Sequence, residues 1–248
     1  MIELKTSGQL EKMRKAGRIV AETLSLIKQA VHPGVTTLEL DRLAENYIRK
    51  CGAVPAFKGY NGFPATLCTS VNEQVVHGIP SLRKLQSGDI ISIDCGAVID
   101  GYFGDAALTL PVGDISPELR QLLEVTEESL MLGIDQAKIG CRLQDISHAV
   151  QTHVEGKGFS VVRDYVGHGI GKAMHEEPQI PNFGRPGRGP RLEVGMVLAI
   201  EPMVNLGTFE VQTLEDHWTV VTRDCKASAH FEHTVAITKN GPEILTRG

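Results

Sequence analysis

The sequence lacks the features that mark membrane, secreted and nucleic-acid-binding proteins. No apolar run is long enough to span a bilayer, and the first residues are charged from the third position, unlike a signal peptide. The five cysteines form no C-x-x-C pair and are odd in number, which favours free thiols over a disulfide framework. A net charge of -5 leaves no surplus of Lys and Arg for phosphate. We therefore expect a cytoplasmic protein that binds neither membrane nor nucleic acid.

The composition that remains is typical of a globular protein. Of 248 residues, 42% are apolar, which is enough to build a full core. Apolar periodicity and capping signals predict helices over 7–30, from Thr36 to about Gly52, from Ser116 onward and over 143–155. Strand-like runs, among them 67–71 and 75–79, follow each pair of helices. This order indicates an α+β fold.

Two helices followed by strands occur twice, which indicates an internal repeat. Residues 85–94 (LQSGDIISID) and 192–201 (LEVGMVLAIE) share a Leu-x-x-Gly frame that ends in Ile and an acid. A His-Gly-Ile triplet precedes each segment, and a strand with another acid follows each. We expect a single catalytic domain, 1–248, with halves of about 1–113 and 114–248. The second half carries an insert, 176–191, that is expected to be a surface loop.

The first pair of acids is predicted to converge. An Asp-Gly pair at 100–101 is a strong hairpin signal between two apolar strands. The register that it sets places Asp94 opposite Ala107 and Asp105 opposite Gly96, so that the two carboxylates share one face as diagonal neighbours. Unpaired buried carboxylates are costly, and no arginine lies near them in the sequence. Like charges so placed call for a cation.

The second half is predicted to repeat this arrangement. Glu201 ends one strand and Glu232 lies in another, so a second hairpin, related to the first by pseudo-twofold symmetry, would aim them at the same centre. Four carboxylates are neutralised by two divalent cations, the usual device of two-metal hydrolases. One imidazole would complete the ligand set.

Nine histidines compete for that place. Glycines flank His168 on both sides and allow close approach of a ligand, which favours it. His77 and His175 are the next candidates. His217, His230 and His233 are expected to be structural or surface residues, as a lone histidine usually is.

Seven segments resemble type I methionine aminopeptidases, members of peptidase family M24, in their short bacterial form. They are 72–80 (NEQVVHGIP), 93–96 (IDCG), 102–106 (YFGDA), 167–171 (GHGIG), 175–178 (HEEP), 200–203 (IEPM) and 231–234 (FEHT). The resemblance implies the pita-bread fold, in which two pseudo-symmetric halves place antiparallel sheet inside and helices outside.

The resemblance also implies a site and a reaction. Two divalent ions (Co, Mn, Fe or Zn) would be held by Asp94, Asp105, His168, Glu201 and Glu232. A hydroxide bridging the ions would attack the carbonyl after an N-terminal methionine, with Glu201 as proton acceptor and His77 and His175 as catalytic and substrate-binding groups. The methionine side chain would enter an apolar pocket of Phe57, Tyr60, Phe63, Cys68, Met174 and Trp218.

The expected substrate is the N-terminus of a nascent polypeptide. The enzyme is expected to act as a monomer in transient contact with the ribosome. Two departures from the family pattern bear on this. Asn61 stands where many relatives carry histidine, and residues 205–218 hold three acids but no Lys or Arg for docking. The loop with Arg185, Arg188 and Arg191 is expected to be solvated surface.

Two alternatives remain. An X-Pro aminopeptidase or prolidase has a similar fold and ligand set but usually an additional N-terminal domain. A non-catalytic pita-bread binding module would keep the fold and lose the ligands, and all five ligand positions are filled here.

Overall fold

The computed structural model describes residues 2–247, and its helices agree with the predicted ones. The helices are α1 (Ser7–Ala30), α2 (Thr37–Lys50), α3 (Pro117–Gln136), α4 (Leu143–Gly156) and a short 3-10 helix, η1 (Tyr60–Gly62). The predicted capping box begins α2, where the Thr36 hydroxyl accepts from the Glu39 N–H and the Glu39 carboxylate accepts from the Thr36 N–H. Within the described chain, no helix has both the length and the apolar character needed to cross a membrane.

The strands form one large antiparallel sheet and two small ones. The large sheet has the order β1 (Val54–Pro55), β4 (Ile90–Ile99), β5 (Tyr102–Pro111), β14 (Glu232–Thr238), β9 (Val197–Ile200), β7 (Gly167–Gly169) and β8 (Glu176–Ile180), with β2 (Leu67–Val71) paired to β4 and β15 (Gly241–Ile244) paired to β14. One small sheet joins β13 (Ser228–His230), β10 (Met203–Asn205) and β6 (Ser160–Val161). The other joins β11 (Val211–Thr213), β12 (Val220–Thr222) and β3 (Gln74–Val76).

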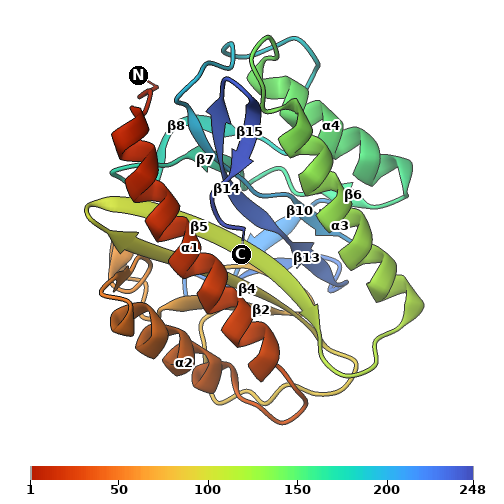
Figure 1. Cartoon of the computed structure of the whole chain (residues 1–248). Coiled ribbons are helices and arrows are strands. Elements are labelled where there is room, and N and C mark those ends of the chain that lie inside the picture. Colours follow the sequence, from red (N-terminus) through yellow and green to blue (C-terminus); the bar gives the residue numbers. More distant parts are fainter. Residues whose placement is uncertain (1, 248) are drawn as a thin grey trace.

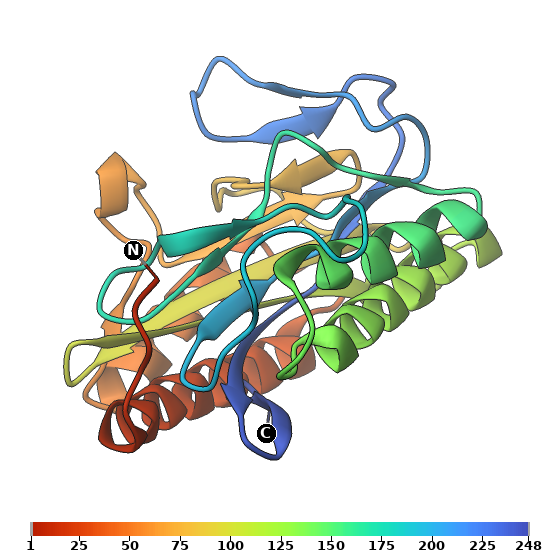
Figure 2. The ribbon, with the colours of Figure 1, turned by 90° about the horizontal axis from the view of Figure 1, so that it is seen from above.

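The four long helices cover one face of the large sheet. In Figure 1, α1 and α2 lie over the part that contains β4 and β5, and α3 and α4 lie over the opposite part. The view from above shows all four on the same side, with the hairpin of β11 and β12 on the other (Figure 2). Each helix pair buries its apolar stripe in a core of its own, with Ile27 and Leu40 in one and Leu122 and Val150 in the other. The predicted α+β, pita-bread arrangement is confirmed.

The predicted first hairpin is also confirmed. Strands β4 and β5 pair so that Asp94 lies opposite Ala107 and Asp105 opposite Gly96. Both turn residues, Asp100 (φ +52°) and Gly101 (φ +75°), adopt the left-handed conformation that a tight two-residue hairpin requires.

The second hairpin prediction was wrong. Strands β9 and β14 are antiparallel neighbours, with Ile200 opposite His233, but residues 201–231 intervene and form β10 to β13. A pairing between strands so distant in sequence is set by burial and not by a turn, so no local signal could specify it.

The two His-Gly-Ile triplets are not structural counterparts either. His168 lies within β7, which pairs with β9. His77 follows β3, which ends at Val76 and not at Ile79 as predicted, because His77 adopts a left-handed φ of +61°. Gly78 then packs against β2, where a Cβ would come within 2.2 Å of the Thr69 carbonyl oxygen.

The insert at 176–191 is only partly a loop. Its first five residues, Glu176–Ile180, form the edge strand β8 beside β7. The Gly-Arg-Pro composition that predicted a loop belongs to the remainder, in which Arg185, Arg188 and Arg191 are exposed.

Candidate metal centre

The five predicted ligands lie on five consecutive strands of the large sheet. In the order β4, β5, β14, β9 and β7, these strands carry or immediately precede Asp94, Asp105, Glu232, Glu201 and His168. Glu232 lies opposite Ala107, so β14 brings the second half against the first. One face of a continuous sheet thus gathers residues up to 138 positions apart, from 94 to 232.

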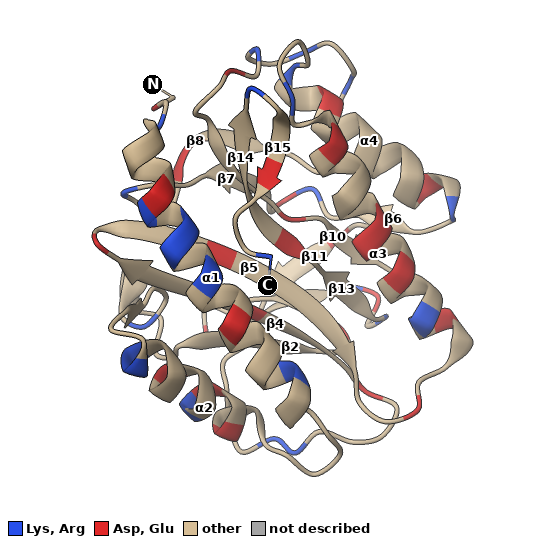
Figure 3. Ribbon diagram, in the orientation of Figure 1, with Lys and Arg blue, Asp and Glu red and all other residues tan. Residues whose placement is uncertain are grey.

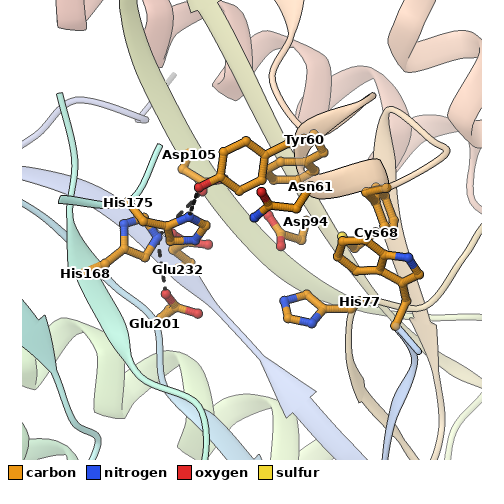
Figure 4. Close-up of a pocket in the computed structure, with 13 residues that line it drawn as sticks. Tyr60, Asn61, Cys68, His77, Asp94, Asp105, His168, His175, Glu201 and Glu232 are labelled. Atoms are coloured by element: carbon orange, nitrogen blue, oxygen red, sulfur yellow. Dashed lines mark hydrogen bonds and ion pairs between the residues drawn. The ribbon is translucent and has the colours of Figure 1, made fainter. Parts of the chain in front are cut away.

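The ligand atoms lie close enough to share ions. Atoms of Asp105, His168 and Glu232 are all within 4.8 Å of one another. His168 Nε2 is 4.0 Å from Asp105 Oδ2 and 3.6 Å from Glu201 Oε1. Figure 4 shows these side chains converging at one end of a cavity. Oxygen donors with one imidazole suit Mn, Fe, Co and Zn.

The electrostatics of the centre call for positive charge. Burial raises the pKa of Asp94 to about 7 and that of Glu201 to about 8. Burial, followed by repulsion from neighbouring carboxylates, also raises the pKa values of Asp105 and Glu232 well above their ordinary range. No Lys or Arg forms an ion pair with any of these four acids among residues 2–247. Figure 3 shows acidic residues on the helices and in loops, and also on β5 and β14 in the middle of the sheet.

Unsatisfied polar atoms provide an independent test of whether cations fit. Asp94 Oδ1, Asp105 Oδ1 and Glu232 Oε1 are buried without a hydrogen-bond partner among the described residues. Buried carboxylate oxygens rarely remain without a hydrogen-bond partner, because the free-energy cost of removing them from water is then not offset. Divalent cations would satisfy these oxygens, so the donor set fits a metal centre. Burial also lowers the pKa of His168 to about 4, which keeps its imidazole neutral and able to coordinate.

An apolar wall continues the cavity beyond the acids. The cavity, of about 210 Å³, is lined on that side by Phe57, Tyr60, Phe63, Cys68 and Trp218. The Phe63 and Trp218 rings meet edge to face, with centroids 5.1 Å apart. Met174, the sixth residue predicted for this pocket, packs in the same apolar cluster but does not line the cavity. Asn61, held at φ +49°, lines it as well.

His77 and His175 both line the cavity, at different places (Figure 4). His175 lies next to His168, with ring centroids 4.3 Å apart, and its Nδ1 is 2.8 Å from the Tyr60 hydroxyl. His77 lies nearer the apolar wall, with its ring centroid 6.5 Å from that of Trp218. Burial lowers the pKa of His77 to about 4 and also lowers that of His175, so both are neutral at pH 7.

The structure adds one residue that the sequence analysis assigned to a merely structural role. His230 is buried, and its Nε2 lies 3.5 Å from Glu201 Oε2 and 4.0 Å from Glu232 Oε2. Its spacing of two from Glu232 was the available signal, because residues two apart on extended chain face the same way. His217 is exposed, and His233 hydrogen-bonds Thr246 on the opposite side of β14.

A sheet that gathers buried carboxylates and an imidazole beside an apolar cavity defines a metal-dependent hydrolase. The model of metallopeptidase family M24 matches residues 11–239, and the chain belongs to that family. It is 61% identical, over the full length of both chains, to methionine aminopeptidase 1 of Bacillus subtilis. The crystal structure of methionine aminopeptidase from Thermotoga maritima, 49% identical, superposes with a TM-score of 0.98 and full coverage of both chains. Prolidase from Pyrococcus furiosus shares the fold, with a TM-score of 0.79 at 24% identity and 65% coverage of that chain.

Proposed function

We propose that this chain is a methionine aminopeptidase that removes the N-terminal methionine from proteins and peptides. The observation that carries the proposal is a single cavity with buried, cation-demanding carboxylates at one end and an apolar, aromatic wall at the other. The first end suits hydrolysis of an amide, and the second suits an unbranched thioether side chain. The 61% sequence identity to a methionine aminopeptidase over the full length of both chains supports this assignment over the prolidase alternative. The prolidase from Pyrococcus furiosus shares the fold at only 24% identity.

Asp94, Asp105, His168, Glu201 and Glu232 would hold two divalent ions. Such ions acidify a water molecule and polarise the scissile carbonyl. Ligands come from both predicted halves, two from 1–113 and three from 114–248, which supports a single catalytic domain.

Glu201 is the group best placed to move the proton. Its carboxylate reaches His168 on one side and faces the cavity, where the attacking water would lie. A carboxylate there takes the proton from the water and delivers it to the nitrogen of the departing peptide. Glu201 therefore has two roles, one in holding the ions and one in proton transfer.

His77 and His175 are proposed to contact the substrate. A neutral imidazole carries one N–H, and when the Tyr60 hydroxyl donates to Nδ1 of His175, that N–H is at Nε2. It can then donate to the oxygen on which negative charge develops as the carbonyl is attacked. His77, between the acids and the apolar wall, is placed to bind the backbone of the substrate.

Phe57, Tyr60, Phe63, Cys68 and Trp218 would form the methionine pocket, with Met174 supporting it from behind. We extend the proposal to nascent chains in the cytoplasm and to action as a monomer. Transient contact with the ribosome would have to use a surface other than residues 205–218, which are acidic.

The test is an assay of metal-stripped protein on the peptides Met-Ala-Ser and Ala-Pro-Ala, with Mn, Co, Fe or Zn added back singly. We expect metal-dependent release of methionine from the first peptide and no cleavage of the second. Glu201→Gln serves as the blank. Cleavage of Ala-Pro-Ala alone would overturn the proposal in favour of an X-Pro peptidase, and inactivity on both with every metal would favour a binding module.

A further inference from the structure

His230 lies behind the metal centre and not in the cavity. It is 1% exposed and does not line the cavity, although the carboxylates that it approaches do. Its Nε2 is buried and has no hydrogen-bond partner among residues 2–247. An unpartnered imidazole nitrogen aimed at two carboxylates requires a reason, because an unsatisfied buried polar atom is costly.

The backbone holds His230 firmly at this place. Strand β13 pairs with β10, with His230 opposite Met203. From the other side, the Thr109 hydroxyl accepts from the His230 N–H at 2.9 Å and donates to the His230 carbonyl oxygen at 2.8 Å. The Ser92 hydroxyl lies 2.8 Å from the Thr109 hydroxyl and can donate to the second lone pair of the Thr109 Oγ1 atom. The imidazole is therefore presented by a rigid support that reaches back to β4.

The carboxylate of Glu201 lies between two imidazoles. Its Oε1 is 3.6 Å from His168 Nε2, and its Oε2 is 3.5 Å from His230 Nε2. His168 lines the cavity and His230 does not. The Glu201 carboxylate therefore has one imidazole on its cavity side and the other on the side away from the cavity. Asn182 donates to the backbone carbonyl of Glu201 at 3.1 Å, which fixes the main chain but places no hydrogen bond on the carboxylate.

We infer that His230 is a positioning residue: its Nε2–H donates to Glu201 Oε2 and so fixes the rotation of the carboxylate that transfers the proton. A movement of a few tenths of an ångström shortens the present 3.5 Å to a normal hydrogen bond. Outer groups that hydrogen-bond a ligating carboxylate commonly fix its orientation in this way. The inference rests on the proposed function, in which Glu201 is the proton acceptor.

The experiment compares His230→Leu, which removes the donor, with His230→Gln, which returns an N–H at similar reach. We expect His230→Leu to lower kcat on Met-Ala-Ser by roughly 10- to 100-fold with little change in KM. His230→Gln should recover most of that loss, which mere filling of space would not explain. His233→Leu is the matched control: this histidine is partly buried, but its Nδ1 lies 2.9 Å from the Thr246 hydroxyl and away from the acids, so its replacement should leave kcat unchanged.

A second measurement does not depend on turnover. Titration of the metal-stripped proteins with Mn²⁺, followed by calorimetry, should show weaker binding in His230→Leu and near-normal binding in His230→Gln. Equal kcat and Mn²⁺ affinity in His230→Leu and wild type would overturn the inference, as would equal impairment of the Leu and Gln variants. If the wild-type protein itself released no methionine, the proposed function would fail instead, and the Mn²⁺ titration would still report on His230.

Discussion

The two halves of the molecule deliver their acids to one centre by different routes. In the first half, Asp94 and Asp105 belong to adjacent strands of one hairpin and lie as diagonal neighbours. In the second, Glu201 immediately follows β9 and Glu232 begins β14, and the chain between them builds parts of two other sheets. The first half is therefore organised by a local turn and the second by tertiary packing. The chain between Glu201 and Glu232 also supplies His230, beside the acids, and Trp218, in the apolar wall of the cavity.

The largest expected effect distinguishes a residue that only binds metal from one that also transfers a proton. Asp94→Asn and Glu201→Gln each remove one of the proposed charged ligands, one per half, and both should weaken metal binding. Only Glu201→Gln also removes the proposed proton acceptor, so with saturating metal its kcat should fall by a further factor of about 100 to 10,000. Steady-state assays over a range of Mn²⁺ concentrations check this. Equal kcat for the two variants at saturation would show that the halves share the proton-transfer role.

The second prediction concerns the stability of the metal-free protein as pH changes. The pKa values of Asp94 (about 7) and Glu201 (about 8) are raised by burial, so the folded state binds more protons than the unfolded state up to that range. Stability should therefore fall as pH rises toward about 8. His77 and His168, whose folded pKa values are lowered to about 4, act with the opposite sign below their ordinary pKa of 6.5.

The informative window is thus between pH 6.5 and about 8, where the acids dominate. Urea denaturation across this window should give a declining free energy of unfolding in the metal-free protein. Asp94→Asn and Glu201→Gln should each flatten the decline, since a neutral side chain no longer titrates. A free energy of unfolding that rises through this window would contradict the raised pKa values of Asp94 and Glu201 in the metal-free protein.

The third prediction compares two glycines that bring a histidine-bearing segment close to a strand. A Cβ on Gly78 would come within 2.2 Å of the Thr69 carbonyl oxygen, and one on Gly169 within 2.2 Å of that of Glu177. Backbone cannot move aside easily, so Gly78→Ala and Gly169→Ala should each cost roughly 1–3 kcal/mol. Thermal unfolding is the measurement. Gly8→Ala, in α1 with nothing within 4 Å, should leave stability unchanged or raise it.

These contrasts also explain what the sequence could predict. The register of β4 and β5 followed from the turn at 100–101, because a two-residue turn fixes every pair beyond it. The neighbours of β14 could not be predicted this way, since β5 and β9 reach it only through long-range packing. The end of β3 at Val76 was missed because the left-handed φ of His77 has no signature in a non-glycine residue. His230 was missed because the role of a buried histidine depends on which carboxylates the fold places beside it.

The smallest expected effect tests how far the first half depends on its turn. Gly101 has φ +75° and open space where a Cβ would stand, so Gly101→Ala introduces backbone strain without a clash. Such strain costs about 1–2 kcal/mol, and Gly101→Asn should cost less because Asn tolerates the left-handed conformation. Denaturant unfolding of both variants gives the comparison. Metal affinity should stay unchanged, because Asp94 lies far along β4 from the turn and is also held by β2, where it pairs with Cys68. A loss of metal affinity in Gly101→Ala without loss of stability would show that the turn, and not the surrounding sheet, positions the first pair of acids.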